Sequence, residues 1–374
     1  MKNLLMVADS DHNANMLYAA RMFVPDPFIY LRVRGKHLLV MSDLEIDRAR
    51  KEAAHCRVIS LAQCQQKLRR NGGKSAGLAR VVHLVLREQR VNKVFVPGDF
   101  PYALAMELRD LGVKVKAKPG GFFPKRETKS ADEVKKISAA LMMAEVGLAE
   151  AIQALKSAKV AKNRRLLYHN APLTSEKLRS IIDTAIIQAS GLASHTIVAG
   201  GSQACDPHEQ GHGPLRANEP IILDVFPRSQ KTGYFGDITR TIVKGRASEA
   251  VRKVYDTVHR GQKMAFQHLR SGAQTSKIHQ AVQELFVREG FKTGKVDGRM
   301  QGFFHGTGHG LGLEIHEAPR MGATSTGKLR AGHVVTVEPG LYYPEIGGVR
   351  LEDVALVTGT SPRNLTQFEK VLEV

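Results

Sequence analysis

The sequence predicts a mixed α/β (α+β) protein of two domains, the first with alternating strands and helices, the second with helices and strands in longer blocks. Three observations carry this prediction: a length of 374 residues, a hydrophobic content of 43%, and a Pro-Gly-Gly break at residues 119–121. The length exceeds the roughly 100–200 residues of one typical domain. The hydrophobic content suits a globular core. We therefore expect domains at residues 1–122 and 123–374.

In the first domain, short periodic segments follow one another. Apolar residues at helical spacing predict helices at 13–21, 76–89 and 102–111. Apolar, β-rich runs predict strands at 28–32, 37–41, 94–96 and 113–115, with a hairpin turn at 34–36.

A capping box opens the second domain, since Ser130 precedes a long helical pattern at 131–157 and Glu133 follows three residues later. Residues 191–213 are rich in Gly, Ser, His and Pro, so we expect a structured loop region there. Further helices are predicted at 174–190, 247–270 and 275–290, and strands at 221–226, 238–243, 334–338, 349–357 and 371–374.

Composition limits the partners and the location. The net charge is +19, but the densest basic runs, 67–74 and 156–165, contain no aromatic residues on which bases could stack, so nucleic acid is not an expected partner. The three cysteines have no paired spacing, which favours reduced thiols. No run of about 18 apolar residues indicates a membrane span, and the apolar run 4–8 is too short for a secretory signal. The cytoplasm is the expected location.

Carboxylates stand at the edges of apolar strands in two places. Asp224 follows Ile221-Ile222-Leu223, and Asp237 begins the next strand run, with glycines and a proline between them. In a hairpin, two such carboxylates can approach on one face. Glu338 ends an apolar run, and Arg350 and Glu352 alternate along a strand, so they face one side. Singly, these residues could equally be turn residues or a surface Arg–Glu pair.

A glycine-rich segment supplies histidines. The segment from His305 through His309 to His316 contains four glycines, which allow close backbone approach to a site: Gly306, Gly308, Gly310 and Gly312. One such histidine alone would more simply be a core or surface residue. Together, however, four carboxylates would repel one another unless cations neutralised them. Two divalent ions balance their charge of −4, and an oxygen-rich set with one imidazole suits Mn²⁺, with Fe²⁺, Co²⁺ or Zn²⁺ as alternatives. Two such ions can hold a bridging hydroxide and polarise a carbonyl.

At these residues the sequence resembles the superfamily of aminopeptidase P, prolidase, methionine aminopeptidase and creatinase, which share the pita-bread fold. The matching segments are Gly308-His309-Gly-Leu-Gly, Glu338-Pro-Gly with Tyr342, and Arg350-Leu-Glu352-Asp353. The resemblance covers most of the chain. It implies a creatinase/prolidase-like N-terminal domain, a pita-bread catalytic domain, and removal of a residue before proline, as in an aminopeptidase P or a prolidase. It also implies a homodimer.

The resemblance implies a role for each residue. The metal ligands would be Asp224, Asp237, His309, Glu338 and Glu352, with Asp237 and Glu352 bridging both ions. Glu338 resembles the proton carrier of the family, and His316 the histidine that stabilises the tetrahedral intermediate. His208 matches a histidine near the scissile bond, with His212 as a rival, and Arg350 resembles an arginine near the substrate terminus.

One feature departs from the family pattern. The two aspartates are 13 positions apart rather than 11, and Phe226 and Pro227 replace the usual glycine region. Two added residues keep strand parity, so both carboxylates can still point inward. Two alternatives remain open: hydrolysis of another C–N bond on this fold, as creatinase illustrates, or a catalytically quiet module that binds protein or RNA.

Overall fold

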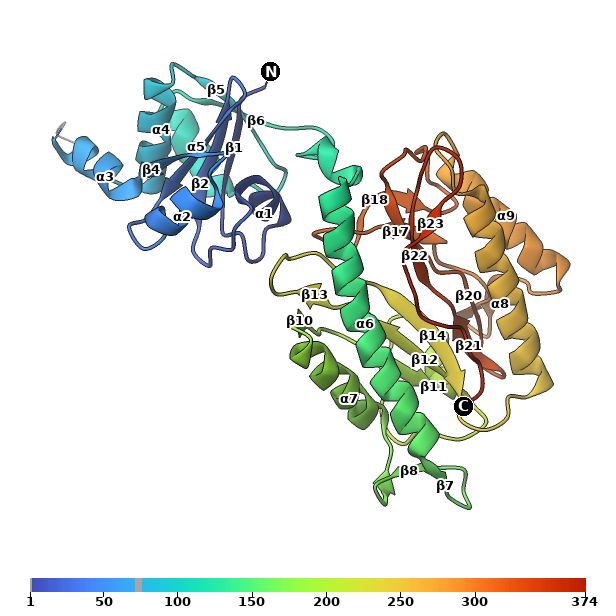
Figure 1. Ribbon diagram of the computed structural model, residues 1–374. Helices are drawn as coiled ribbons and strands as arrows, with labels where there is room; N and C mark the ends of the chain where they lie inside the picture. Colours follow the sequence, from blue (N-terminus) through green and yellow to red (C-terminus); the bar gives the residue numbers. More distant parts are fainter. Residues whose placement is uncertain (1, 71–75) are drawn as a thin grey trace. The chain divides into compact units, whose positions relative to one another are not determined.

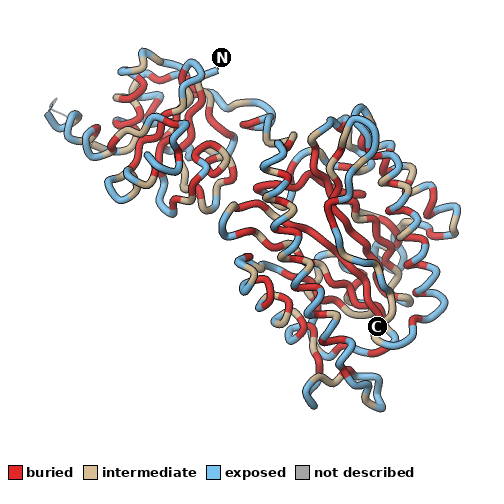
Figure 2. Tube along the Cα trace, viewed as in Figure 1, coloured by how far each residue is buried: buried red, intermediate tan, exposed pale blue. Residues whose placement is uncertain are grey.

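The computed structural model describes residues 2–70 and 76–374, which form two compact units, Met1–Arg126 and Glu127–Val374 (Figure 1). The basic run predicted at 67–74 lies partly outside the described residues; its first four residues end a helix. In both units, buried residues follow the strands and the inner faces of the helices, as Figure 2 shows. Cys56, Cys64 and Cys205 are buried free thiols, as predicted.

The first unit is built on one six-stranded sheet of order β4-β3-β2-β1-β5-β6. β1 pairs antiparallel with β2, and β5 and β6 add in parallel. Its strands are β1 (Leu4–Ala8), β2 (Phe28–Val33), β3 (Lys36–Met41), β4 (Arg57–Ser60), β5 (Lys93–Val96) and β6 (Lys114–Ala117). Its helices are α1 (Ala14–Ala20), α2 (Ile46–Glu52), α3 (Leu61–Arg70), α4 (Leu78–Glu88) and α5 (Tyr102–Asp110).

The two faces of this sheet differ because side chains alternate along each strand. One face, with Val94 and Val96, packs with α4 and α5 into an apolar cluster. The other face, with Leu4 and Tyr30, packs with α1 and with Phe123. Because Phe123 belongs to this core, the chain stays with the first unit beyond its last strand. The predicted helices and strands are confirmed, whereas β1, α2, β4 and α3 were not predicted.

The second unit places two helix pairs around its sheets, α6 with α7 and α8 with α9 (Figure 1). The helices are α6 (Ala131–Ser157), α7 (Ser175–Gln188), α8 (Glu249–His268) and α9 (Thr275–Arg288), with short helices η1 (Pro124–Glu127) and η2 (Gly201–Cys205). The predicted capping box is present, as Ser130 and Glu133 exchange hydrogen bonds. α6 is long and apolar enough to span a membrane by composition, but ten of its residues are buried in the protein, which marks it as a core helix.

A three-stranded sheet, β11-β12-β14, packs against α6 and α7, and a five-stranded sheet, β18-β17-β19-β22-β23, packs against α8 and α9. The strands of these sheets are β11 (Ile197–Gly200), β12 (Pro220–Val225), β14 (Ile238–Val243), β17 (Gly308–Gly310), β18 (Glu317–Met321), β19 (Val334–Val337), β22 (Asp353–Leu356) and β23 (Arg363–Asn364). Shorter strands are β7 (Lys159–Val160), β8 (Leu166–Tyr168), β9 (Ala171–Pro172), β10 (Gly191–Leu192), β13 (Arg228–Ser229), β15 (Gly294–Val296), β16 (Arg299–Gln301), β20 (Gly340–Tyr343) and β21 (Gly347–Arg350).

Three predicted elements need correction. The strand at 349–357 is two strands, β21 and β22, in different sheets, because the chain leaves one ladder before it enters the next. The strand at 371–374 is only a bridge between Glu373 and Val243. The loop region 191–213 contains β10, β11 and η2, since the polar residues there hid a four-residue apolar strand.

Candidate active site

A cavity of about 770 Å³ lies in the second unit, where the ends of β12, β14, β17, β19 and β21 meet. The cavity is lined by all eight residues predicted as ligands or as catalytic or substrate-binding groups: Asp224, Asp237, His309, Glu338, Glu352, His208, His316 and Arg350. His212, the rival of His208, lies instead in a separate polar cavity of about 190 Å³. The structure therefore brings together residues that are up to 144 positions apart.

The two aspartates come from one hairpin. β12 pairs antiparallel with β14, with Asp224 opposite Thr239. Asp237 precedes Thr239 by two positions, so all three side chains point to the same face. The connection between the two aspartates contains β13, which pairs with β10. The longer connection therefore leaves the strand register of the two aspartates intact.

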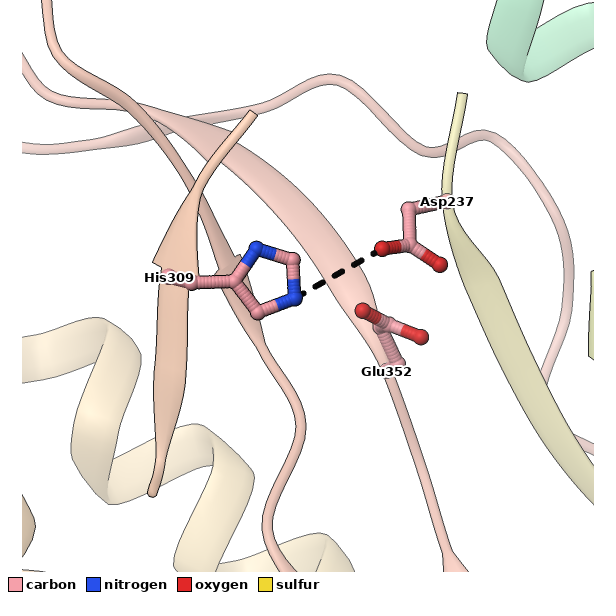
Figure 3. A group of neighbouring side chains, drawn as sticks. All are labelled: Asp237, His309 and Glu352. Carbon is pink, nitrogen blue, oxygen red and sulfur yellow. Dashed lines mark ion pairs between the residues drawn. The ribbon is translucent and has the colours of Figure 1, made fainter. Parts of the chain in front are cut away.

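His309 and Glu338 face each other from neighbouring strands. Nε2 of His309 lies 3.1 Å from Oε1 of Glu338. It also lies 3.7 Å from Oδ2 of Asp237, the ion pair that the dashed line in Figure 3 marks. Nδ1 of His309 lies 3.1 Å from the carbonyl oxygen of Gly310 and can donate to it, while Nε2 faces the carboxylates. Burial opposes the charged form of His309, but the hydrogen bond and charge of Glu338 outweigh it and raise the pKa of His309, which favours a protonated Nε2 that donates to Glu338 in the metal-free site. Thr336 donates to Glu338 at 3.0 Å and fixes that carboxylate.

Glu352 lies in the gap between β21 and β22. The hydroxyl of Thr239 donates to its Oε2 at 2.7 Å. One atom each of Asp237, His309 and Glu352 lie within 4.8 Å of one another, and the three side chains converge in Figure 3. This separation and this donor set suit a divalent ion.

The electrostatics of the metal-free site reflect crowded acids. Burial raises the pKa of Asp237 well above its usual value, and the charge of Asp224 raises it further. Burial likewise raises the pKa of Glu352, reinforced by Asp237 and Glu338. Burial opposes ionisation of Glu338 too, but the hydrogen bond and charge of His309 outweigh it and lower the pKa of Glu338 to about 2.

The site also contains buried oxygens without protein partners. Oδ1 of Asp224 and Oε1 of Glu352 accept no hydrogen bond from any described residue. An unpartnered buried carboxylate oxygen is costly. The donor atoms of the set are mainly oxygens with one imidazole nitrogen, so the residues fit a divalent cation.

Arg350 belongs to a hydrogen-bonded chain that the sequence did not predict. It donates to Oδ2 of Asp224 at 2.6 Å and to the hydroxyl of Tyr342 at 2.9 Å. That hydroxyl lies 2.8 Å from Nε2 of His305. Burial lowers the pKa of His305 to about 4, so the imidazole is neutral and accepts from Tyr342. Arg350 thus fixes one oxygen of Asp224 and leaves the other for a cation.

His316 lines one wall of the cavity. The imidazole ring of His316 packs edge-on against the ring of His309, with the ring centroids 4.4 Å apart. Burial, with the nearby charge of His309, lowers the pKa of His316 to about 4. Arg320 lines the same wall, and the sequence did not predict it because an arginine after Ala-Pro carries no distinguishing signal. His208 is exposed on a loop of the wall.

A buried ion pair supports the loop that carries His316. Nζ of Lys129 lies 2.9 Å from Oε2 of Glu317, and the two side chains are 1% and 6% exposed. The other oxygen of Glu317 accepts the backbone N–H groups of Leu313 and Glu314, at 3.0 and 3.2 Å. Glu317 therefore closes the loop that ends in His316, and Lys129 neutralises it.

Comparison with known proteins identifies the family. The model of metallopeptidase family M24 matches residues 135–359, which is more than half of the chain. This chain belongs to metallopeptidase family M24. The membership agrees with the resemblance that the His309, Glu338 and Glu352 segments predicted.

Among relatives of this M24 chain, the Xaa-Pro dipeptidase of Pyrococcus furiosus is 34% identical over 48% of this chain and 49% of that protein. The chain thus matches about half the length of this curated relative. The uncharacterized peptidase YqhT of Bacillus subtilis is 30% identical over 61% of this chain and 67% of that protein.

Solved structures share the whole fold. Prolidase from Pyrococcus furiosus superposes with a TM-score of 0.78 at 22% identity, covering 99% of this M24 chain and 97% of that chain. The X-Pro aminopeptidase from Thermotoga maritima superposes with a TM-score of 0.83 at 19% identity, covering 100% of this chain and 98% of that chain. These likenesses confirm the predicted architecture, an N-terminal α/β domain followed by a pita-bread domain.

Proposed function

We propose that this chain is a dinuclear-metal peptidase that hydrolyses the bond between an N-terminal residue and proline. The observation that carries the proposal is the convergence of four carboxylates and one imidazole on one cavity, with Oδ1 of Asp224 and Oε1 of Glu352 buried and unpartnered. The relative named Xaa-Pro dipeptidase supports the choice of proline.

The metal ligands in this proposal are Asp224, Asp237, His309, Glu338 and Glu352. Two divalent ions held there would supply an activated water at neutral pH and polarise the scissile carbonyl. Mn²⁺ is our first choice because oxygens dominate the donor set, with Co²⁺, Fe²⁺ or Zn²⁺ as alternatives. We extend the proposal to a homodimer in the cytoplasm.

The protein's own groups account for the proton and the developing charge. Glu338 lines the cavity, and we propose that its carboxylate accepts a proton from the attacking water, the role that the family resemblance implies. His316 is neutral and can donate an N–H to the carbonyl oxygen as it becomes an oxyanion. His208 lines the same cavity and can contribute a second donor.

The substrate terminus has two candidate partners. Arg350 was predicted to lie near it, but its guanidinium is bound to Asp224 and Tyr342, which favours a role in positioning that aspartate. Arg320 lies on the cavity wall near His316, and its exposed guanidinium can pair with a free carboxylate. If the carboxylate that pairs with Arg320 is that of the proline itself, the substrate is an Xaa-Pro dipeptide.

The test is hydrolysis of Xaa-Pro dipeptides, longer Xaa-Pro peptides and matched peptides without proline, each with Mn²⁺. We expect cleavage only of the proline peptides. The Asp237→Ala and His309→Ala variants should lose about 10³-fold or more in kcat/KM, since a Lewis-acid metal contributes several kcal/mol. Arg320→Met should raise KM for dipeptides more than for longer peptides.

The outcome separates the alternatives. Metal analysis by mass spectrometry accompanies each assay, so that failure to load metal is distinguished from failure to turn over. A chain that holds two ions and cleaves none of the peptides would refute the peptidase proposal. Amide substrates of other classes, or a binding role, would then take its place.

A further inference from the structure

A second charged region lies in the first unit, far from the ligands in sequence. Six basic residues and one aromatic residue gather on one face of the sheet, at its β1-β5-β6 side. We call this set the basic face: Lys2, Arg32, Lys93, Lys114, Lys116, Lys118 and Phe95.

Strand register places these residues together. Leu4 lies opposite Arg32 on β2 and beside Phe95 on β5, and Phe95 lies beside Lys116 on β6. Side chains two positions apart share a face, so Lys93 and Lys114 join them. The alternate residues, Val94, Val96 and Val115, point to the opposite face and into the core. On β5 and β6 the lysines of the basic face are therefore exposed, whereas the opposite face of these strands packs into the core.

The cations surround a partly exposed ring. Nζ of Lys2 lies 4.8 Å from the centroid of Phe95, and Nζ of Lys93 lies 5.5 Å from it. Four of the lysines, at positions 2, 93, 114 and 116, are exposed. Their flexible chains can move from the ring when a ligand offers a better partner.

No carboxylate neutralises these charges. Within residues 2–70 and 76–374, none of the six basic side chains forms an ion pair. Burial lowers the pKa of Lys118, and the charges of Lys2 and Arg32 lower it further. Nε of Arg32 is buried and has no hydrogen-bond partner. The face therefore has cations in excess and an unsatisfied donor.

A simpler explanation accounts for only part of this arrangement. Lysines on an edge strand prevent sheets of different molecules from pairing, and β6 is an edge strand. That explains Lys114 and Lys116. It does not explain Arg32 and Lys93, which lie on the interior strands β2 and β5, or Lys2, which lies just before β1. It also does not explain why Nε of Arg32 lacks a hydrogen-bond partner among the described residues.

We propose that the basic face binds single-stranded nucleic acid. The first unit has 23 basic and 11 acidic residues, a net +12 of the total +19. A row of lysines on flat strands suits the repeated charge of a phosphate backbone, and an aromatic ring among them offers a platform for a base. The sequence analysis did not expect nucleic acid because neither basic run contains an aromatic. The sheet assembles the face from four separate segments.

The test uses fluorescence anisotropy of labelled 20-nucleotide single-stranded RNA and DNA with the full-length protein. The variant is K93Q/K114Q/K116Q, and the control is K135Q/K162Q/K263Q, three exposed lysines of the second unit with the same change in net charge. We expect the patch variant to bind about tenfold or more weakly, with a salt slope lower by about 2, and the control to bind nearly as wild type. Thermal unfolding verifies that both variants are folded.

Phe95→Leu and an acidic competitor test the choice of nucleic acid over other polyanions. Loss of base stacking should weaken binding about fivefold or more. Poly-glutamate of equal charge should compete poorly. No binding of either oligonucleotide, equal loss in the control variant, or an unchanged Phe95→Leu would overturn the proposal, as would full displacement by poly-glutamate. None of these readouts depends on peptidase activity.

Discussion

The two units of this protein use charged residues in opposite ways. Among the residues that the structure describes, those buried in the first unit include only two polar ones, Ser10 and Ser60, and neither is charged. The second unit buries seven charged side chains: Lys129, Asp237, Arg240, Glu317, Arg350, Glu352 and Asp353. The first unit carries more net charge but keeps it at the surface.

The difference shows what buried charge is for. A sheet with Val and Leu on both faces folds without it, as the first unit demonstrates. Removing a charge from water costs several kcal/mol, so a domain retains it only where another group or a ligand compensates. Arg240 and Asp353 compensate each other at 2.9 Å, as do Lys129 and Glu317. Within residues 2–70 and 76–374, neither Asp237 nor Glu352 forms an ion pair with a lysine or arginine, and these two carboxylates mark the site.

Among the tests of this comparison between the two units, we expect the largest effect from Lys129→Met. It leaves Glu317 buried and uncompensated, so we expect the second unit to lose about 3–5 kcal/mol in denaturant unfolding. Because Glu317 closes the loop that carries His316, kcat of the proposed peptidase should fall more than KM changes.

Two further variants sharpen that test. Lys67→Met breaks the exposed pair with Glu88 in the first unit, and its denaturation midpoint should stay at the wild-type value. The double variant K129M/E317Q should regain part of the lost stability, since it leaves no uncompensated charge. Equal effects of Lys129→Met and Lys67→Met would contradict the comparison.

We expect an effect of intermediate size on folding stability from the protonation of His333 at low pH. Its side chain is buried, and burial lowers its pKa to about 4, helped by Arg330 and Lys129. The unfolded imidazole binds a proton near pH 6.5, whereas the folded one does so only near pH 4. Stability therefore falls as pH drops through that window, by on the order of 1–3 kcal/mol.

His333→Gln removes this titration, so its unfolding free energy should vary less steeply between pH 6.5 and 4 than that of the wild type. Denaturant titrations across the window measure it. His12→Gln, at a side chain 86% exposed in the first unit, is the control. A variant with the wild-type pH slope would show that His333 is not responsible.

The smallest expected effect is a gain in stability, whereas the preceding predictions are losses. Asp237→Asn removes a carboxylate whose ionisation is opposed by burial and by Asp224, so the metal-free protein should become more stable. A gain of about 1 kcal/mol corresponds to a rise in Tm of roughly 2–4 °C for a domain of this size. Calorimetry in a chelator measures it. A lower Tm for the metal-free variant would show that the wild-type carboxylate is compensated without metal.

Sequence reasoning predicted the parts of this site that local pattern determines. Asp224, Asp237 and Glu338 stand beside apolar strand runs, and the glycines around His309 reveal a close approach, so their convergence on one cavity could be expected. The fold class followed from the alternation of periodic segments. The predicted metal roles of these residues stay predictions.

Other features depend on contacts that no local pattern encodes. Lys129 and Glu317 are 188 positions apart, and each alone reads as a surface residue. The basic face arises from the register of four strands. The break between β21 and β22, at Leu351 and Glu352, was missed because residues 349–357 form one continuous β-rich run in the sequence. The two strands belong to different sheets, which only the three-dimensional structure reveals.

The spacing of the proposed ligands also sets an order of events during synthesis. Asp224 and Glu352 are 128 positions apart, and Glu338 also lies in the later part. At about 5–20 residues per second, a ribosome needs roughly 6–26 s to travel between the first and the last of them. A nascent chain during that interval has the aspartate hairpin but not the carboxylates that complete the cavity. With the proposed ligand set, the growing polypeptide would therefore stay inactive until the segments that carry Glu338 and Glu352 are made and docked.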